Sequence, residues 1–124
     1  MLKILRSVAA LLAIGVCWLT SGPARAADPI KVGFSMALTG SVAQNGKQLI
    51  IALELWRDDV NANGGLLGRP VELVYYDDQS NSANVPGIYT KLITVDKVDL
   101  LLGPYATNMA AAAMPVIMQH ERRG

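Results

Sequence analysis

Apolar runs alternate with helix-like segments three times along this chain, and that alternation constrains the fold more than any other feature. The runs at residues 30–38, 71–76 and 99–102 are rich in the aliphatic, β-branched and aromatic side chains typical of buried strands. Each run leads through a polar turn into a segment that favours a helix. The alternation therefore predicts an α/β fold in the order βαβαβα, with a parallel sheet flanked by helices and wound right-handed.

The first helix is expected from Lys47 to the turn at 63–65, where two glycines can adopt the left-handed conformation that closes a helix. Its inner side is predicted from apolar residues at i, i+4, i+7 and i+11. These residues are Leu49, Leu53, Trp56 and Val60.

The second and third helices are predicted from shorter patterns. The second follows the polar loop after residue 76, with Val85, Ile88, Tyr89 and Leu92 on its inner side. The third runs from Met109 to about His120, and Pro115 should kink it or mark a late restart. Packing roles are expected for two groups of side chains: Trp56, Tyr75 and Tyr76, and the methionines Met109, Met114 and Met118.

Residues 1–26 are typical of a secretory signal peptide. Lys3 and Arg6 precede an apolar stretch at 8–19, and the small residues of Ala24-Arg25-Ala26 predict cleavage before Ala27. The apolar stretch is shorter than the ~20 residues that span a bilayer as a helix. Two alternatives are a lipoprotein signal acylated at Cys17 and a permanent N-terminal membrane anchor.

The composition of the remaining chain excludes several functions. Loss of three basic residues with the signal leaves 8 Lys and Arg against 10 Asp and Glu, which argues against nucleic-acid binding. The single cysteine leaves as well, which excludes thiol catalysis and cysteine metal sites. One histidine, His120, cannot form a histidine-rich metal site. We expect no cofactor.

Two motifs nearly match catalytic or nucleotide-binding signatures. The segment at 40–47 resembles a phosphate-binding loop, but five residues separate its glycines and Gln48 stands where a magnesium-binding hydroxyl is needed. The dinucleotide pattern GxGxxG is absent from this turn. Residues 33–37 imitate a nucleophile elbow, yet they lie inside a predicted strand.

Asp77 and Asp78 form the most conspicuous acidic pair. Adjacent residues that leave a strand point in different directions and converge poorly on one ligand. Capping of backbone amides is therefore the favoured role, and a catalytic or metal-binding pair is the alternative.

Ligands of open parallel sheets bind beyond the carboxyl ends of the strands. Three predicted loops leave those ends, at residues 39–46, 77–84 and 103–108. In the third loop, Thr107 and Asn108 fall at the start of a helix, where free amides and the helix dipole suit a carboxylate. The Thr107 hydroxyl would bind either the ligand or, by capping, the helix amides.

Several short segments in fixed order resemble the opening of the type I periplasmic binding proteins, in particular the branched-chain amino acid (leucine-binding-protein-like) substrate-binding proteins of ABC transporters. The segments are KVG (31–33), LTG (38–40), Gly46, NANGGLLGR (61–69), VYYDDQ (74–79) and LGPY (102–105). The resemblance covers residues 28–124. It implies a two-lobed protein that closes on a small molecule, with residues 27–124 as the N-terminal, truncated part of the first lobe.

The resemblance also assigns a site. In the family, the loop after the third strand holds the α-carboxylate and ammonium of an amino acid, which places that role on Ala106 and Thr107, with Tyr105 and Asn108 adjacent. The loop after the first strand borders the ligand side chain, here at Asn45. Similar amino-acid binders often have an aromatic residue at this position, and other members take amides, urea-like compounds or aromatic acids, so the ligand class stays open.

The function expected from this resemblance is non-enzymatic. The chain would belong to a periplasmic solute-binding component that delivers amino acids, small carboxylates or amides to the membrane permease subunits of an ABC importer. A ligand-binding sensory domain of a receptor with the same fold is the first alternative. An exported enzyme that uses Asp77 and Asp78 is the second.

Overall fold

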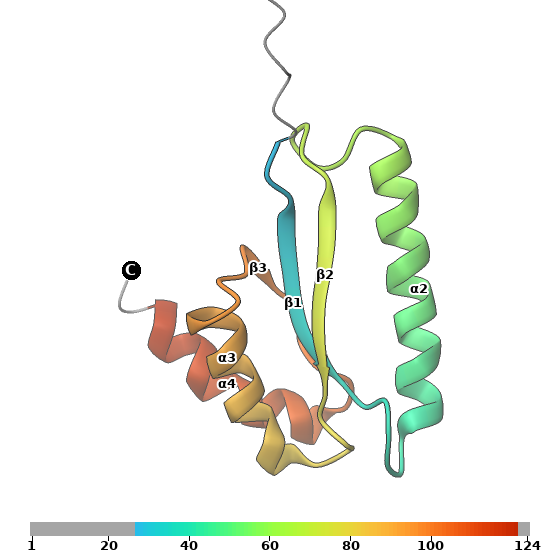
Figure 1. The fold of residues 1–124 in the computed structure, drawn as a ribbon. Coiled ribbons are helices and arrows are strands. Elements are labelled where there is room, and N and C mark those ends of the chain that lie inside the picture. The colour runs from blue at the N-terminus through green and yellow to red at the C-terminus, as the bar shows by residue number, and fades with distance from the viewer. Residues whose placement is uncertain (1–26, 122–124) are drawn as a thin grey trace, which may run out of the picture.

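The computed structural model describes residues 27–121, so the predicted signal peptide and its cleavage site lie outside the described residues. Within 27–121, no helix combines the length and apolar character needed to cross a membrane. The elements follow the predicted alternation (Figure 1). They are β1 (Ile30–Met36), α2 (Ala43–Ala62), β2 (Val71–Asp77), the 3-10 turn η2 (Ser82–Asn84), α3 (Val85–Thr94), β3 (Leu100–Leu101) and α4 (Thr107–Glu121).

The sheet is parallel, with strand order β2-β1-β3. β1 pairs with β2 along its whole length, from Ile30 opposite Val71 to Met36 opposite Asp77. β3 adds only two pairs, Val32 with Leu100 and Gly33 with Leu101. This confirms the predicted fold class. The central position of β1 explains its nearly continuous apolar sequence, because it is flanked by a strand on each side and covered on both faces.

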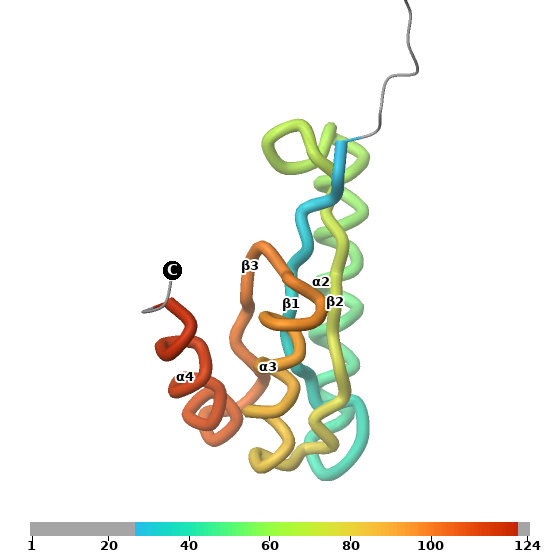
Figure 2. Tube along the Cα trace, turned by 60° about the vertical axis from the view of Figure 1, so that its left-hand side comes forward, coloured from blue at the N-terminus to red at the C-terminus, as the bar shows by residue number. Residues whose placement is uncertain are grey.

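The helices cover both faces of the sheet, as Figures 1 and 2 show: α2 lies on one side, and α3 and α4 lie together on the other. Alternate residues of β2 divide between the two layers. Leu73 and Tyr75 pack with Phe34 toward α2, and Val74 and Tyr76 pack toward α3 and α4. The result is two apolar layers separated by the sheet.

α2 begins four residues earlier than predicted, at Ala43 instead of Lys47. A Cβ at Gly46 would lie 1.9 Å from the carbonyl oxygen of Ala37, so only glycine allows the helix to start this close to the end of β1. The predicted stripe is wrong in part. Leu49 and Trp56 are each 39% exposed, and Ile50 is buried instead. The packing role expected of Trp56 is therefore not found.

α3 confirms its prediction, because Val85, Tyr89 and Leu92 are completely buried and Ile88 packs beside them. α4 starts two residues earlier than expected and continues through Pro115 without a restart. The methionine prediction holds for Met109 at 2% exposure. It is wrong for two others, which face solvent: Met114 at 51% and Met118 at 44% exposure.

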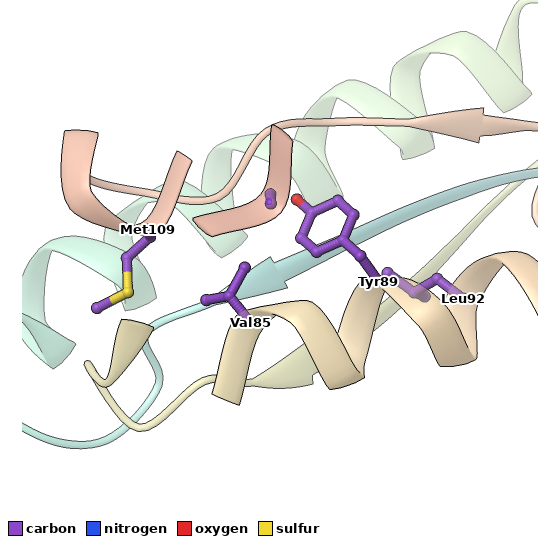
Figure 3. Close-up of a cluster of buried hydrophobic side chains, with 5 residues drawn as sticks. Val85, Tyr89, Leu92 and Met109 are labelled. Atoms are coloured by element: carbon purple, nitrogen blue, oxygen red, sulfur yellow. The ribbon is translucent and has the colours of Figure 1, made fainter. Parts of the chain in front are cut away.

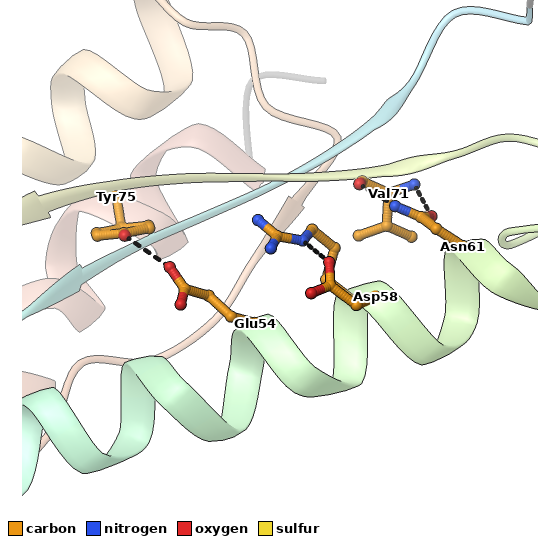
Figure 4. Close-up of polar contacts among 6 residues, drawn as sticks. Glu54, Asp58, Asn61, Val71 and Tyr75 are labelled. Atoms are coloured by element: carbon orange, nitrogen blue, oxygen red, sulfur yellow. Dashed lines mark hydrogen bonds and ion pairs between the residues drawn. The ribbon is translucent and has the colours of Figure 1, made fainter.

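Side chains near the amino ends of the strands hold the sheet edge opposite the three loops. The Asn61 amide, at the end of α2, makes both hydrogen bonds available on the Val71 backbone, donating to its carbonyl at 2.9 Å and accepting from its amide at 2.7 Å (Figure 4). Arg69 donates to the carbonyls of Asp28 (2.7 Å) and Pro29 (3.2 Å). These contacts fix where β1 and β2 begin.

Candidate functional site

The loops after β1 and β2 are joined directly at the carboxyl edge of the sheet. Asp77, the last residue of β2, accepts hydrogen bonds from the amides of Leu38 (3.0 Å) and Thr39 (3.2 Å) and from the Thr39 hydroxyl (2.6 Å). It also accepts from the amide of Gln79 at 2.8 Å. Burial raises the pKa of Asp77, but these hydrogen bonds outweigh burial and leave the pKa below its ordinary value.

Ser80 makes a second link between the same loops. Its hydroxyl donates to the carbonyl of Thr39 at 2.7 Å and accepts from the amide of Val42 at 3.2 Å. Gly40 has a φ of +86°, and a Cβ there would lie 2.6 Å from the carbonyl oxygen of Gln79. The two loops thus approach so closely that a side chain at Gly40 would separate them.

Asp78 points away from Asp77 and into the protein. It is fully buried, and its carboxylate accepts from the Ser35 hydroxyl at 3.1 Å and from the Ser80 amide at 2.9 Å. The favoured role of the acidic pair, binding of backbone amides, is confirmed, although the amides belong to the two loops and not to α3. Within residues 27–121, no three His, Cys, Asp or Glu side chains are placed to hold a metal ion.

The third loop approaches the first through two of the predicted site residues. The Asn45 side-chain amide, in the first turn of α2, donates to the Tyr105 hydroxyl at 2.6 Å. Tyr105 also packs against the apolar layer of Phe34, Met36 and Ile50. Asn45 and Tyr105 therefore form one wall at the edge where the loops meet.

The other predicted residues form the start of α4. Ala106 has a φ of +77°, an uncommon conformation for a residue with a Cβ, and its carbonyl accepts the first helical hydrogen bond, from the Ala110 amide at 3.0 Å. α4 begins at Thr107, so Ala106 occupies the capping position and has no side-chain oxygen to offer. Thr107 and Asn108 are exposed. This placement leaves the Thr107 hydroxyl outside the usual capping position.

The start of α4 has the features of an anion site. Amides in the first turn of a helix have no acceptor within the helix, and the helix dipole places partial positive charge there. Strained backbone such as that of Ala106 is common where a loop is shaped for a ligand. The arrangement suits a carboxylate held by backbone amides and a hydroxyl.

Sequence reasoning missed the buried contacts behind the loops. Ser35 appeared only within the predicted strand and at the centre of the nucleophile-elbow imitation at 33–37, and Tyr89 only as a packing residue. In the structure Ser35 binds Asp78, and the Tyr89 hydroxyl donates to the carbonyl of Leu102. A serine within a strand that is otherwise apolar was the available signal, because a buried hydroxyl requires a hydrogen-bond partner.

The fold is a parallel α/β unit with three loops at one edge of its sheet, and comparison with known proteins gives its family. Residues 29–122 match the family model described as "Periplasmic binding protein", and the chain belongs to that family. The family name implies an extracytoplasmic location, and the relatives that the chain matches are binding proteins and not enzymes.

Individual relatives resemble the chain over most of its length. It is 32% identical over 106 residues to Leu/Ile/Val-binding protein homolog 7 of Brucella abortus, covering 86% of this chain and 26% of the relative. The structure of the branched-chain amino acid transporter substrate binding protein LivJ of Streptococcus pneumoniae, in complex with isoleucine, matches with a TM-score of 0.71 at 33% identity, covering 74% of this chain and 26% of that one.

A third relative has a different ligand. The solute binding protein of an ABC transporter from R. palustris, in complex with benzoate, matches with a TM-score of 0.66 at 29% identity, covering 74% of this chain and 25% of that one. The chain spans about a quarter of the length of the relatives it matches.

Proposed function

We propose that this chain contributes the first part of the ligand-binding lobe of a periplasmic solute-binding protein that serves an ABC importer. Residues 1–26 direct export, and residues 27–124 form the N-terminal part of the lobe. The protein binds an amino acid or a related small carboxylate or amide and delivers it to permease subunits in the membrane. Its family membership and the transporter relatives support this proposal.

The observation that carries the proposal is the meeting of three loops at one edge of the sheet beside the start of α4. Asp77 and Ser80 join the first two loops, and the Asn45–Tyr105 hydrogen bond joins the first to the third. Ala106 turns the chain so that α4 starts at this edge. A ligand placed there meets groups from all three loops.

Each of the five site residues has a distinct role in this proposal. Backbone amides near Ala106 and Asn108 and the Thr107 hydroxyl bind the ligand carboxylate. Asn45 and Tyr105 border the rest of the ligand. Because their polar groups already bind each other at 2.6 Å, they present a fixed wall rather than two free side chains.

The ligand class is inferred from a group that the relatives' ligands share. Isoleucine is bound in one related structure and benzoate in another, and both molecules carry a carboxylate attached to a different apolar group. A carboxylate is also the group best suited to the start of α4. The carboxylate is therefore the constant part of the ligand, and the wall at Asn45 selects the variable part.

Calorimetry tests the proposal on the mature protein with its complete natural chain, titrated with a panel of amino acids, small carboxylates and amides. We expect heat of binding from at least one carboxylate. Thr107→Val removes the hydroxyl at constant shape and should weaken that ligand about tenfold, as expected for a lost charge-assisted hydrogen bond. Thr107→Ser keeps the hydroxyl and serves as the matched control.

Two results would contradict the proposal. If no compound of the panel gives heat of binding, the proposed ligand-binding function is ruled out. Equal affinities of the valine and serine variants would show that the Thr107 hydroxyl does not contact the ligand.

A further inference from the structure

Tyr89 is the largest completely buried side chain of the described residues, and it lies at the centre of an apolar cluster. Val85 and Leu92 lie on either side of it along α3, and Met109 of α4 belongs to the same cluster; all three are buried (Figure 3). A phenol in such surroundings is costly unless its hydroxyl finds a partner. The partner is the backbone carbonyl of Leu102, which accepts the hydrogen bond from Tyr89.

Leu102 is the residue at which the third loop leaves the sheet. β3 is only two residues long and is a weak support for the loop that it precedes. The Leu102 amide donates to the carbonyl of Gly33 at 2.9 Å, and its carbonyl accepts from Tyr89. Both backbone groups of Leu102 are thus held, one by the central strand and one by α3.

Buried polar groups surround the same phenol. Ser35 and Asp78 are completely buried and bind each other, and they link the ends of β1 and β2. Burial raises the pKa of Tyr89 to about 12, and the charge of the nearby Asp78 adds to the rise. The phenol therefore remains a protonated donor at any physiological pH.

We propose that Tyr89 is a positioning residue for the candidate ligand site: its hydroxyl fixes the point from which the loop 103–108 departs and so sets where Ala106 and Thr107 lie. Tyr89 acts through the Leu102 backbone and does not touch the ligand. The ligand-binding consequence rests on the function proposed above, whereas the effect on the loop does not.

The test compares two tyrosine-to-phenylalanine changes in the mature protein with its complete natural chain. Tyr89→Phe keeps the buried ring and removes the donor to Leu102. Tyr75→Phe is the matched control, because that hydroxyl donates to Glu54 at 3.3 Å on the opposite face of the sheet. Amide hydrogen exchange at residues 105–110 should be on the order of tenfold faster in Tyr89→Phe and unchanged in Tyr75→Phe.

A second readout separates positioning from general stability. Leu92→Val loosens the same cluster without removing a polar group. Tyr89→Phe should weaken the carboxylate ligand about tenfold, and Leu92→Val should leave the affinity within about twofold even where both lower the melting temperature.

The outcomes are distinct. Loop exchange that is equal in the two phenylalanine variants overturns the positioning role, as does an affinity loss shared equally by Leu92→Val and Tyr89→Phe. If the unchanged protein binds nothing in the panel, the proposed function fails, and the exchange ratio still decides the role of Tyr89.

Discussion

The two faces of the sheet are covered very differently. On the side of α3 and α4, Val85, Tyr89 and Leu92 are 0% exposed. On the other side, α2 leaves Ile51 58% and Leu55 65% exposed, and Ile50 is its only buried apolar side chain. The α3/α4 side is the larger apolar layer, whereas the α2 side has a smaller buried cluster of Phe34, Met36 and Ile50 beneath a helix whose outer side chains are exposed.

The difference shows how each face is stabilised. α2 packs on the sheet through Ile50 and Leu53, and specific contacts fix its two ends: Gly46 against Ala37 and Asn61 against Val71. Between them, Tyr75 and Glu54 supply one polar contact (Figure 4). The α3/α4 face is stabilised by packing, and Tyr89, one of its buried side chains, donates the hydrogen bond that holds the Leu102 carbonyl and hence the third loop. Stability and the geometry of the candidate site therefore depend on the same face.

The largest loss of stability is expected from a substitution in the α3/α4 layer. Leu92→Ala removes a completely buried side chain and should cost about 2–5 kcal/mol of the free energy of unfolding. Leu55→Ala, on the exposed side of α2, is the matched control and should cost less than ~0.5 kcal/mol. Denaturant unfolding measures both, and similar losses would remove the contrast between the faces.

A smaller effect is expected at the end of α2. Asn61→Ala leaves the amide and carbonyl of the buried Val71 without these partners and should cost about 1–3 kcal/mol. Asn63→Ala is the control, because the Asn63 side chain binds Asp59 at the surface, at the end of the same helix. If the two changes have equal effects in thermal unfolding, α2 is not anchored through Asn61.

Asp77 joins the loops after β1 and β2, and its contribution to the free energy of unfolding should depend on pH. Its pKa is lowered in the folded protein, so its stabilising contribution is present above the unfolded value of 3.8 and is lost as the pH falls through the folded pKa. Asp77→Asn should cost about 1 kcal/mol at neutral pH.

Melting temperatures measured from pH 7 to pH 2.5 check this sign. The difference in melting temperature between Asp77→Asn and the unchanged protein should become smaller as the pH falls below 3.8, the pKa of Asp77 in the unfolded chain. Glu72→Gln, an exposed carboxylate on the same strand, is the control. A gap that widens in acid would mean that the hydrogen bonds do not stabilise the charged form of Asp77.

The smallest effect tests whether α2 is open to solvent in the whole protein. Ile51→Gln on α2 and Met114→Gln on α4 change side chains that are 58% and 51% exposed, and each should alter the free energy of unfolding by less than ~0.5 kcal/mol. A loss above ~1 kcal/mol confined to Ile51→Gln would show that another part of the protein packs on α2.

Local patterns predicted much of this fold. The runs that became β1 and β2 are apolar because neighbouring layers cover them, and the inner side of α3 has a clear helical period at Val85, Tyr89 and Leu92. The predictions failed where contacts between residues far apart in the sequence determine the structure. α2 starts at Ala43 because Gly46 fits against Ala37, and that contact leaves no trace in the helical period.

The candidate site was predictable only in outline. The strand–helix order placed three loops at one edge, since carboxyl ends of parallel strands meet there. It did not predict that Asn45 would lie within α2 and bind Tyr105, or that Ala106 would adopt a positive φ. Met114 and Met118 were expected in the core because they are apolar, but they lie on the exposed side of α4. Apolar residues occur around much of that helix, so its sequence does not show which side is buried.

The most direct test is a crystal structure of the mature protein, with its complete natural chain, bound to the carboxylate identified by calorimetry. We predict that the carboxylate lies within hydrogen-bonding distance of the Thr107 hydroxyl and of backbone amides at the start of α4, with Asn45 and Tyr105 beside the rest of the ligand. A ligand bound away from the carboxyl edge of the sheet, with no group of residues 105–108 in contact, would contradict it.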